Sequence, residues 1–130
     1  MSDVSDLLEV DFDYLQRKGW QYKVQKIPFG SSFEVDIIIY KFPLPSKYIP
    51  CEVDLLLRQF PGYPDTPMDM FWTRPDVILV DSKQKPPATE VYESYLDLQW
   101  QRWSRHWNGW RSGIDTLENY IQAIIMELQK

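Results

Sequence analysis

One histidine stands in the most basic stretch of an otherwise acidic chain. His106 lies in the segment WQRWSRHWNGW, with Arg102, Arg105 and Arg111 close to it in sequence. Neighbouring guanidinium groups favour the neutral imidazole by like-charge repulsion, and imidazole exchanges a proton readily near neutral pH. His106 is therefore the candidate catalytic residue, acting as a general base. The alternative is a buried histidine that forms hydrogen bonds among the surrounding tryptophans.

Four tryptophans surround this histidine and allow three interpretations. Their spacing is that of a single helical face: Trp100, Trp103, Trp107 and Trp110. Such a row can pack as core against a neighbouring helix. It can also anchor a partner, because Trp and Arg are enriched at the energetic centres of interfaces. The partner-binding interpretation assigns this role to Trp100, Arg102, Trp103, Arg105 and Trp107. The third interpretation is a carbohydrate-binding ridge of tryptophans.

The chain has one cysteine and one histidine, which limits its redox and metal chemistry. A single cysteine excludes an internal disulfide and zinc sites built on several cysteines, and a single histidine excludes motifs that need two. We therefore expect no metal site and no cofactor. Cys51 opens a predicted strand beside Glu52 and Asp54, whose charges oppose thiolate formation. We interpret Cys51 as a small apolar side chain and not as a nucleophile.

Length and charge narrow the class of protein further. The 130 residues, 44% hydrophobic and 25% charged, predict one globular domain over residues 1–130. The net charge of −5 argues against binding to nucleic acid. No apolar run approaches the roughly 18 residues of a membrane span, and the acidic N-terminal region does not resemble a secretory signal. The sequence thus predicts a cytoplasmic protein with no membrane contact.

Prolines separate the elements that must position these residues. All ten lie between Pro28 and Pro87, so long helices are expected only at the two ends of the chain. Helical spacing of apolar residues predicts a helix over Asp3–Lys18, capped by Ser2 and ended by Gly19.

A second helix is predicted at the other end of the chain. Ser112 and Asp115 form a candidate capping pair. An apolar stripe follows at helical spacing and consists of Ile114, Leu117, Ile121, Ile124, Ile125 and Leu128. This amphipathic pattern predicts that the helix packs one face against the rest of the domain.

Strand-like runs occupy the region between the helices. They are Gln21–Ile27, Phe33–Tyr40, Glu52–Leu57 and Met68–Thr73. A hairpin turn at Pro28–Ser31 joins the first two. Consecutive strands joined this closely predict a four-stranded antiparallel meander in an α+β fold. Arg74–Pro87 is expected to be irregular, and Thr89–Gly109 fits no single pattern.

A stiff proline loop joins the last two predicted strands. In FPGYPDTP, Pro61, Pro64 and Pro67 each fix φ at about −65°, which restricts the path of the chain. Tyr63 can pack its ring while its hydroxyl finds a polar partner. We interpret these four residues as a structural loop, and a proline-rich recognition loop is the alternative.

The order of these segments resembles the fold of ubiquitin-conjugating enzymes. In that fold, a helix precedes a strand meander, a strand ends in an FPxxYP motif, and a Trp-Ser pair lies before a later helix. More narrowly, this sequence is similar to the bacterial proteins of prokaryotic family E of that superfamily. The similar blocks are FPLPSKY, CEVDLLLRQFPGYPDTPMDMFW, WQRWSRHW and GIDTLENY. The resemblance covers about residues 4 to 128 and implies this fold for the whole chain.

The resemblance implies the fold but not the thioester chemistry. A working conjugating enzyme carries ubiquitin on a cysteine that follows the fourth strand, and residues 75–110 contain no cysteine. The family's His-Pro-Asn segment is also absent, and Asn108, the nearest asparagine, lies in an unrelated context.

The function that the resemblance implies is an atypical conjugating component of a bacterial ubiquitin-like modification pathway. His106 would then act as a base or contact the tail of the ubiquitin-like protein. The implied partners are a ubiquitin-like protein, an activating enzyme and a JAB-type peptidase. The alternative is a non-catalytic module that binds the ubiquitin-like protein or its activating enzyme.

Overall fold

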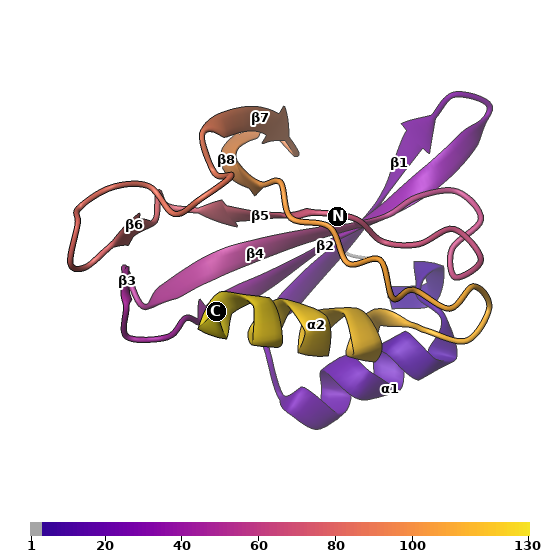
Figure 1. Ribbon diagram of the computed structural model, residues 1–130. Coiled ribbons are helices and arrows are strands. Elements are labelled where there is room, and N and C mark those ends of the chain that lie inside the picture. Colours follow the sequence, from indigo (N-terminus) through magenta and orange to yellow (C-terminus); the bar gives the residue numbers. More distant parts are fainter. Residues whose placement is uncertain (1–3) are drawn as a thin grey trace.

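A curled antiparallel sheet with two helices against one face forms the fold of residues 4–130, which the computed structural model describes (Figure 1). The helical elements are the 3-10 turn η1 (Val4–Asp6), α1 (Glu9–Lys18) and α2 (Leu117–Gln129). The strands are β1 (Tyr22–Phe29), β2 (Ser32–Pro43), β3 (Tyr48–Ile49), β4 (Glu52–Gln59), β5 (Phe71–Arg74), β6 (Ile78–Leu79), β7 (Val91–Tyr95) and β8 (Leu98–Trp103). No helix within these residues is long and apolar enough to cross a bilayer.

The main sheet has six strands in the order β1-β2-β4-β5-β8-β7, and every pair is antiparallel. The α+β class and the sequential pairing of the first four strands are confirmed. The expected limit of four strands is wrong, because the β7–β8 hairpin adds two strands to the edge of β5. The short strands β3 and β6 form a separate two-stranded sheet.

The β7–β8 hairpin overturns the helical interpretation of the tryptophan row. Trp100 and Trp103 lie in β8, where side chains alternate between the two faces. An odd separation of three residues therefore places these two indoles on opposite faces of the sheet. Trp107 and Trp110 lie in the irregular segment that follows. The four tryptophans do not form one ridge.

The first helix is shorter than its pattern predicted. It begins at Glu9, after η1, and its N-cap residue Leu8 has an extended backbone and no side-chain capping bond. The predicted start at Asp3 and cap at Ser2 lie outside the described residues. The predicted end is confirmed, because Gly19 adopts the left-handed conformation with φ 70° that lacks a steric penalty only in glycine.

Strand boundaries shift where single residues bend the chain. The first hairpin is tighter than predicted, since Pro28 and Phe29 still pair with β2 across a turn at residues 30–31. Before β5, Met70 has a positive φ of 59°, so the regular strand begins at Phe71 and not at Met68. The segment predicted to be irregular contains β6.

The start of α2 uses a different cap from the predicted pair. Thr116 and Asn119 form a capping box, with Asn119 Oδ1 accepting the Thr116 amide at 3.0 Å. Asp115 instead binds Arg111, and Ser112 takes no part in the cap. Ile114 is 65% exposed and Ile125 is 40% exposed, so both lie outside the buried stripe. The buried side of α2 consists of Leu117, Tyr120, Ile121, Ile124 and Leu128.

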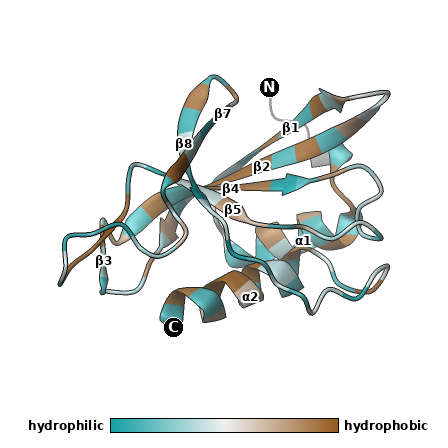
Figure 2. Cartoon of the chain, turned by 45° about the horizontal axis from the view of Figure 1, so that its top comes forward, coloured by the Kyte–Doolittle hydropathy of each residue, from teal (hydrophilic) through white to brown (hydrophobic). Residues whose placement is uncertain are grey.

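Each face of the sheet has its own core. Residues of α1 and α2 pack with Ile37, Ile39, Leu55 and Leu57 on one face. The opposite face carries a smaller cluster of Ile38, Leu56, Trp72 and Trp100. Hydrophobic and hydrophilic bands alternate along β2 in Figure 2, as expected for a strand whose successive side chains point to opposite faces.

The proline loop packs against the segment that leads into α2. The carbonyl of Pro64 accepts the Trp110 Nε1–H at 2.9 Å and the Gly113 amide at 3.2 Å. Pro61 accepts the Thr66 hydroxyl at 2.8 Å, which closes the loop on itself. The loop therefore fixes the approach of the chain to the last helix.

Candidate functional site

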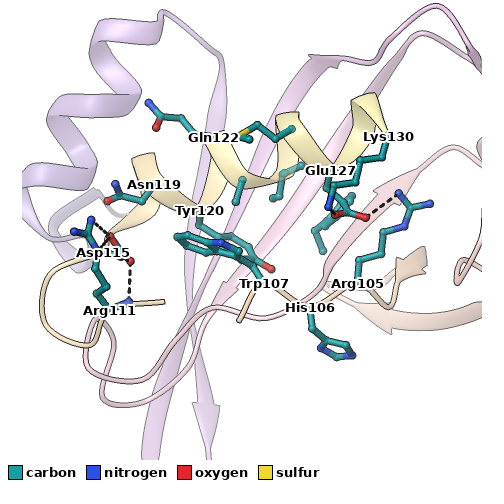
Figure 3. A pocket seen from close by; sticks show the side chains of 14 residues that line it. Arg105, His106, Trp107, Arg111, Asp115, Asn119, Tyr120, Gln122, Glu127 and Lys130 are labelled. Carbon is teal, nitrogen blue, oxygen red and sulfur yellow. Dashed lines mark hydrogen bonds and ion pairs between the residues drawn. The ribbon is translucent and has the colours of Figure 1, made fainter. Parts of the chain in front are cut away.

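A groove of about 510 Å³ runs along α2, between this helix and the segment after β8. Residues 105–107 and Arg111 lie along one side, and one flank of α2 forms the other (Figure 3). The proline loop and the strand pairing of β8 fix the two ends of the segment. The groove is thus a product of the fold and does not depend on a single flexible loop.

Aromatic side chains form the middle of the groove. The rings of Trp107 and Tyr120 lie 6.3 Å apart, and Phe71 lines the same space. The Tyr120 hydroxyl donates to the carbonyl of Met70 at 2.6 Å. Burial raises the pKa of Tyr120 above its usual range, so the phenol stays protonated as a donor. This floor suits an apolar segment of a bound chain.

Ion pairs flank the aromatic floor (Figure 3). Arg111 Nη2 lies 2.7 Å from Asp115 Oδ1, and this guanidinium lowers the pKa of the Asp115 carboxyl. At the other end, Arg105 Nη1 lies 3.7 Å from Glu127 Oε2, while Lys130 Nζ lies 3.1 Å from Glu127 Oε1. Both ends of the groove therefore present cations next to carboxylates.

His106 lies at the outer edge of this groove and is held by a carboxylate. Its Nδ1 is 2.7 Å from Asp69 Oδ1, and the two side chains are 57% and 43% exposed. In Figure 3 the imidazole points away from α2. A neutral ring that donates from Nδ1 to Asp69 keeps its lone pair on Nε2. The alternative of a buried histidine is wrong.

Two of the five predicted partner-binding residues are fully buried. Trp100 and Trp103 are both 0% exposed. Trp103 Nε1 donates to Thr73 Oγ1 at 2.8 Å, and Trp100 Nε1 donates to the carbonyl of Tyr95 at 3.0 Å. Indoles in this position stabilise the two cores and cannot contact a partner. The carbohydrate-binding ridge, which needs these indoles on the surface, is not formed.

The other predicted residues fall into two places. Arg105 and Trp107 line the groove beside His106. Arg102 does not line it, because this side chain pairs with Glu93 Oε2 at 3.2 Å and donates to Ser104 Oγ at 2.8 Å. The structure thus brings together only the later part of the predicted basic-aromatic segment.

Sequence reasoning missed Asp69 and Tyr120. Asp69 lies between two methionines that were assigned to a regular strand, and only the positive φ of Met70 removes it from that alternation. Tyr120 belongs to the C-terminal helix but was not counted in its apolar stripe. A helical projection places it three residues after Leu117 and four before Ile124, on the same side as the predicted stripe, and this spacing was the signal that the sequence offered.

Cys51 is exposed and lines neither this groove nor the adjoining one beside Tyr48. This small side chain is therefore not part of either core, and its assignment as a residue other than a nucleophile stays a prediction. Within residues 4–130 no cluster of three or more His, Cys, Asp or Glu side chains is placed to hold a metal ion.

Comparison with known proteins identifies one family. The model of prokaryotic E2 family E matches residues 7–130. The match includes both helices and every strand that frames the groove. Searches of curated proteins and of solved structures gave no match.

Proposed function

The chain belongs to prokaryotic E2 family E, and from this membership we propose that it assists transfer of a ubiquitin-like protein without carrying the thioester itself. Membership in the family supports a ubiquitin-conjugating-like role. Residues 75–110 contain no cysteine, so the chain has no thiol there to carry a thioester, and we propose a role that does not need one.

The observation that carries this proposal is the His106–Asp69 pair at the edge of the groove. Asp69 Oδ1, 2.7 Å from Nδ1, holds the imidazole in place, and the ring points away from α2, so the acceptor amine would approach from the outer side of the groove (Figure 3). More than half of the His106 side chain is exposed, so a partner can reach it. A histidine held by a carboxylate in this way has the arrangement of a general base.

In this proposal the groove binds the C-terminal tail of the ubiquitin-like protein. Apolar tail residues lie on the floor of Trp107 and Tyr120. Arg111 uses Nε and Nη2 toward Asp115, which leaves Nη1 for a tail carbonyl. Its side chain is 63% exposed. The lining residues of α2 and its end run from Asn119 to Lys130, roughly 17 Å of helix, which an extended tail of about five residues covers.

His106 then removes a proton from the acceptor amine. The amine nitrogen attacks the terminal carbonyl carbon of the tail, which the activating enzyme presents as an adenylate or a thioester. The new bond is an amide, the leaving group is AMP or the thiolate of the activating enzyme, and Nε2 takes the amine proton. No covalent bond to this chain is needed.

A non-catalytic binding module is the second candidate function. The direction of the His106 imidazole favours it, because the ring points away from α2 and lies to one side of the floor that would hold the tail (Figure 3). In this version the aromatic floor holds the ubiquitin-like protein and His106 only contacts it. The activating enzyme and a JAB-type peptidase stay predicted partners on the resemblance alone.

A reconstituted reaction separates the two candidates. The chain is mixed with a bacterial ubiquitin-like protein, its activating enzyme and ATP, and the amount of conjugate that resists reductant is measured. A pull-down measures binding of the ubiquitin-like protein to the chain in parallel. We expect conjugates that depend on the chain, and their loss in His106→Ala. Asn108→Ala, an exposed change two residues away that does not line the groove, is the matched control. Binding without any chain-dependent conjugate would establish the non-catalytic module instead.

A further inference from the structure

Two carboxyl groups and one guanidinium are buried together on the sheet face opposite the helices. Glu34 and Asp36 lie in β2 and are 3% and 2% exposed, and Arg58 lies beside them in β4. Asp36 and Arg58 are direct partners in the register of the two strands. The cluster adjoins the second core and takes no part in the groove along α2.

Arg58 connects this cluster to the β7–β8 hairpin. Its Nε and Nη2 bind Glu34 Oε2 and Oε1 at 2.8 and 2.9 Å, and its Nη1 donates to the Tyr95 hydroxyl at 2.9 Å. The guanidinium also lies over the Tyr95 ring, 4.1 Å from its centroid. Tyr95 in turn packs against Trp72 at 5.6 Å. Arg58 is therefore a direct link between the central strands and the hairpin that covers the second core.

Asp36 lacks the contacts that Glu34 has. Within residues 4–130 its Oδ1 is buried without a hydrogen-bond partner, and the nearest cationic atom is Arg58 Nε at 3.9 Å. Burial and the neighbouring Glu34 carboxyl raise the pKa of Asp36 to about 8. A hydrogen bond with Asp36 and contact with Arg58 lower the pKa of Glu34 despite its burial. The two pKa shifts have opposite directions, so a proton on this pair is favoured at Asp36 over Glu34.

Other charged and polar groups face the cluster from every neighbouring strand. By strand register, the groups that share this face of the sheet are Lys23 and Gln25 from β1, Arg74 from β5, Glu93 and Tyr95 from β7, and Arg102 from β8. Glu93 already binds Arg102 at 3.2 Å, and Arg74 stacks on Trp100 at 5.9 Å. Arg58 is the cation that already lies against both carboxyl groups.

We propose that the Asp36 carboxyl is a proton-controlled latch for the β7–β8 hairpin. When Asp36 ionises, two carboxylates share one guanidinium in a buried space, and Arg58 shifts toward Asp36. That shift breaks the Arg58–Tyr95 hydrogen bond and loosens the hairpin over Trp72 and Trp100. The proposal rests on this face of the sheet alone and is independent of the proposed function.

Indole N–H signals in an NMR pH titration of the whole chain test the latch. Trp72 Nε1 donates to Glu93 at 2.9 Å and Trp100 Nε1 donates to Tyr95, so both report on the hairpin. Trp103 Nε1, bound to Thr73 in the other core, is the internal control. We expect the Trp72 and Trp100 signals to shift together with a midpoint near pH 8, while the Trp103 signal stays in place.

Asp36→Asn keeps the shape of the side chain and removes its ionisation. The pH-dependent shift of the Trp72 and Trp100 signals should be absent in this variant. The proposal is overturned if the wild-type chain shows no such shift, or if the variant shows the same shift as wild type. If Asp36→Asn does not fold, Tyr95→Phe replaces it with Trp100 Nε1 as the reporter, because the Tyr95 hydroxyl binds both Arg58 and Glu93 Oε1, and Glu93 Oε1 is also the acceptor of Trp72 Nε1. We expect its Trp100 signal to begin near the high-pH position and to move by less than half the wild-type change, and an undiminished shift contradicts the proposal.

Discussion

The buried carboxylate of Asp11 accepts a 2.7 Å hydrogen bond from the hydroxyl of Tyr63, the tyrosine of the proline loop. The same carboxylate accepts Gln59 Nε2 at 3.0 Å and the amide of Leu117 at 3.2 Å. One side chain of α1 thus connects β4, the proline loop and the first turn of α2. These bonds hold the loop to the helix that lines the groove.

Tyr63→Phe should lower the free energy of unfolding by about 1 kcal/mol, because it removes one hydrogen bond to a buried carboxylate. Asp11→Ala should cost about 3 kcal/mol, since it leaves three donors without their acceptor. Urea denaturation measures both. Tyr92→Phe is the matched control, because it removes an exposed bond to Asp76 and should change stability little. Equal losses for Tyr63→Phe and Tyr92→Phe would show that the Asp11 connection is not important for stability.

Asp36 should make the protein less stable as the pH rises. Its pKa is about 8 in the folded chain and near its ordinary 3.8 when unfolded, so the folded state holds the proton more tightly. The resulting contribution to stability is complete below about pH 4 and is lost as the pH rises through 8. Comparing urea denaturation of wild type and Asp36→Asn at pH 5, 7 and 9 isolates this effect. If the free energies of unfolding of wild type and Asp36→Asn differ by the same amount at all three pH values, the prediction is contradicted.

Trp103 and Trp107 should respond differently to truncation. Trp103→Ala removes a fully buried indole and should cost about 3–5 kcal/mol of stability. Trp107 is half-buried at the groove, so Trp107→Ala should cost less and should weaken binding of the ubiquitin-like protein. Thermal melting and pull-down of the same variants test this pair. If a folded Trp107→Ala variant binds the ubiquitin-like protein as well as wild type does, the aromatic floor does not contact the tail.

Cys51→Ser should leave stability within about 0.5 kcal/mol, because the side chain is exposed. Conjugate formation should also be unchanged, since Cys51 does not line the groove. Gels run with and without reductant check for a thioester. A reductant-sensitive adduct that disappears in Cys51→Ser would make this thiol the acceptor of the tail.

Local patterns predicted the elements whose formation depends on nearby residues. The two terminal helices and the first four strands of the sheet follow from proline placement and from apolar spacing, and Gly19 ends α1 as expected. The β7–β8 hairpin was missed because it depends on pairing with β5, about thirty residues earlier in the chain. Strand pairing of this kind overrides a helical spacing of tryptophans.

The candidate site was only partly visible in the sequence for the same reason. His106, Arg105 and Trp107 are neighbours in the chain, so their types and spacing identified them together. Asp69 is far from His106 in sequence, and the bend at Met70 brings the two side chains into contact. Strand parity places Trp100 and Trp103 on opposite faces of the sheet, and both are buried because each face has its own core, which the sequence pattern did not reveal.

The rate of isopeptide formation at saturating activated ubiquitin-like protein tests the central claim most directly. His106→Gln keeps a polar side chain but removes the base, so kcat should fall by roughly 10²–10⁴-fold while KM changes little. Asp69→Asn, which only orients the ring, should lower kcat less, and Asn108→Ala should match wild type. Unchanged kcat in a folded His106→Gln variant would contradict the account.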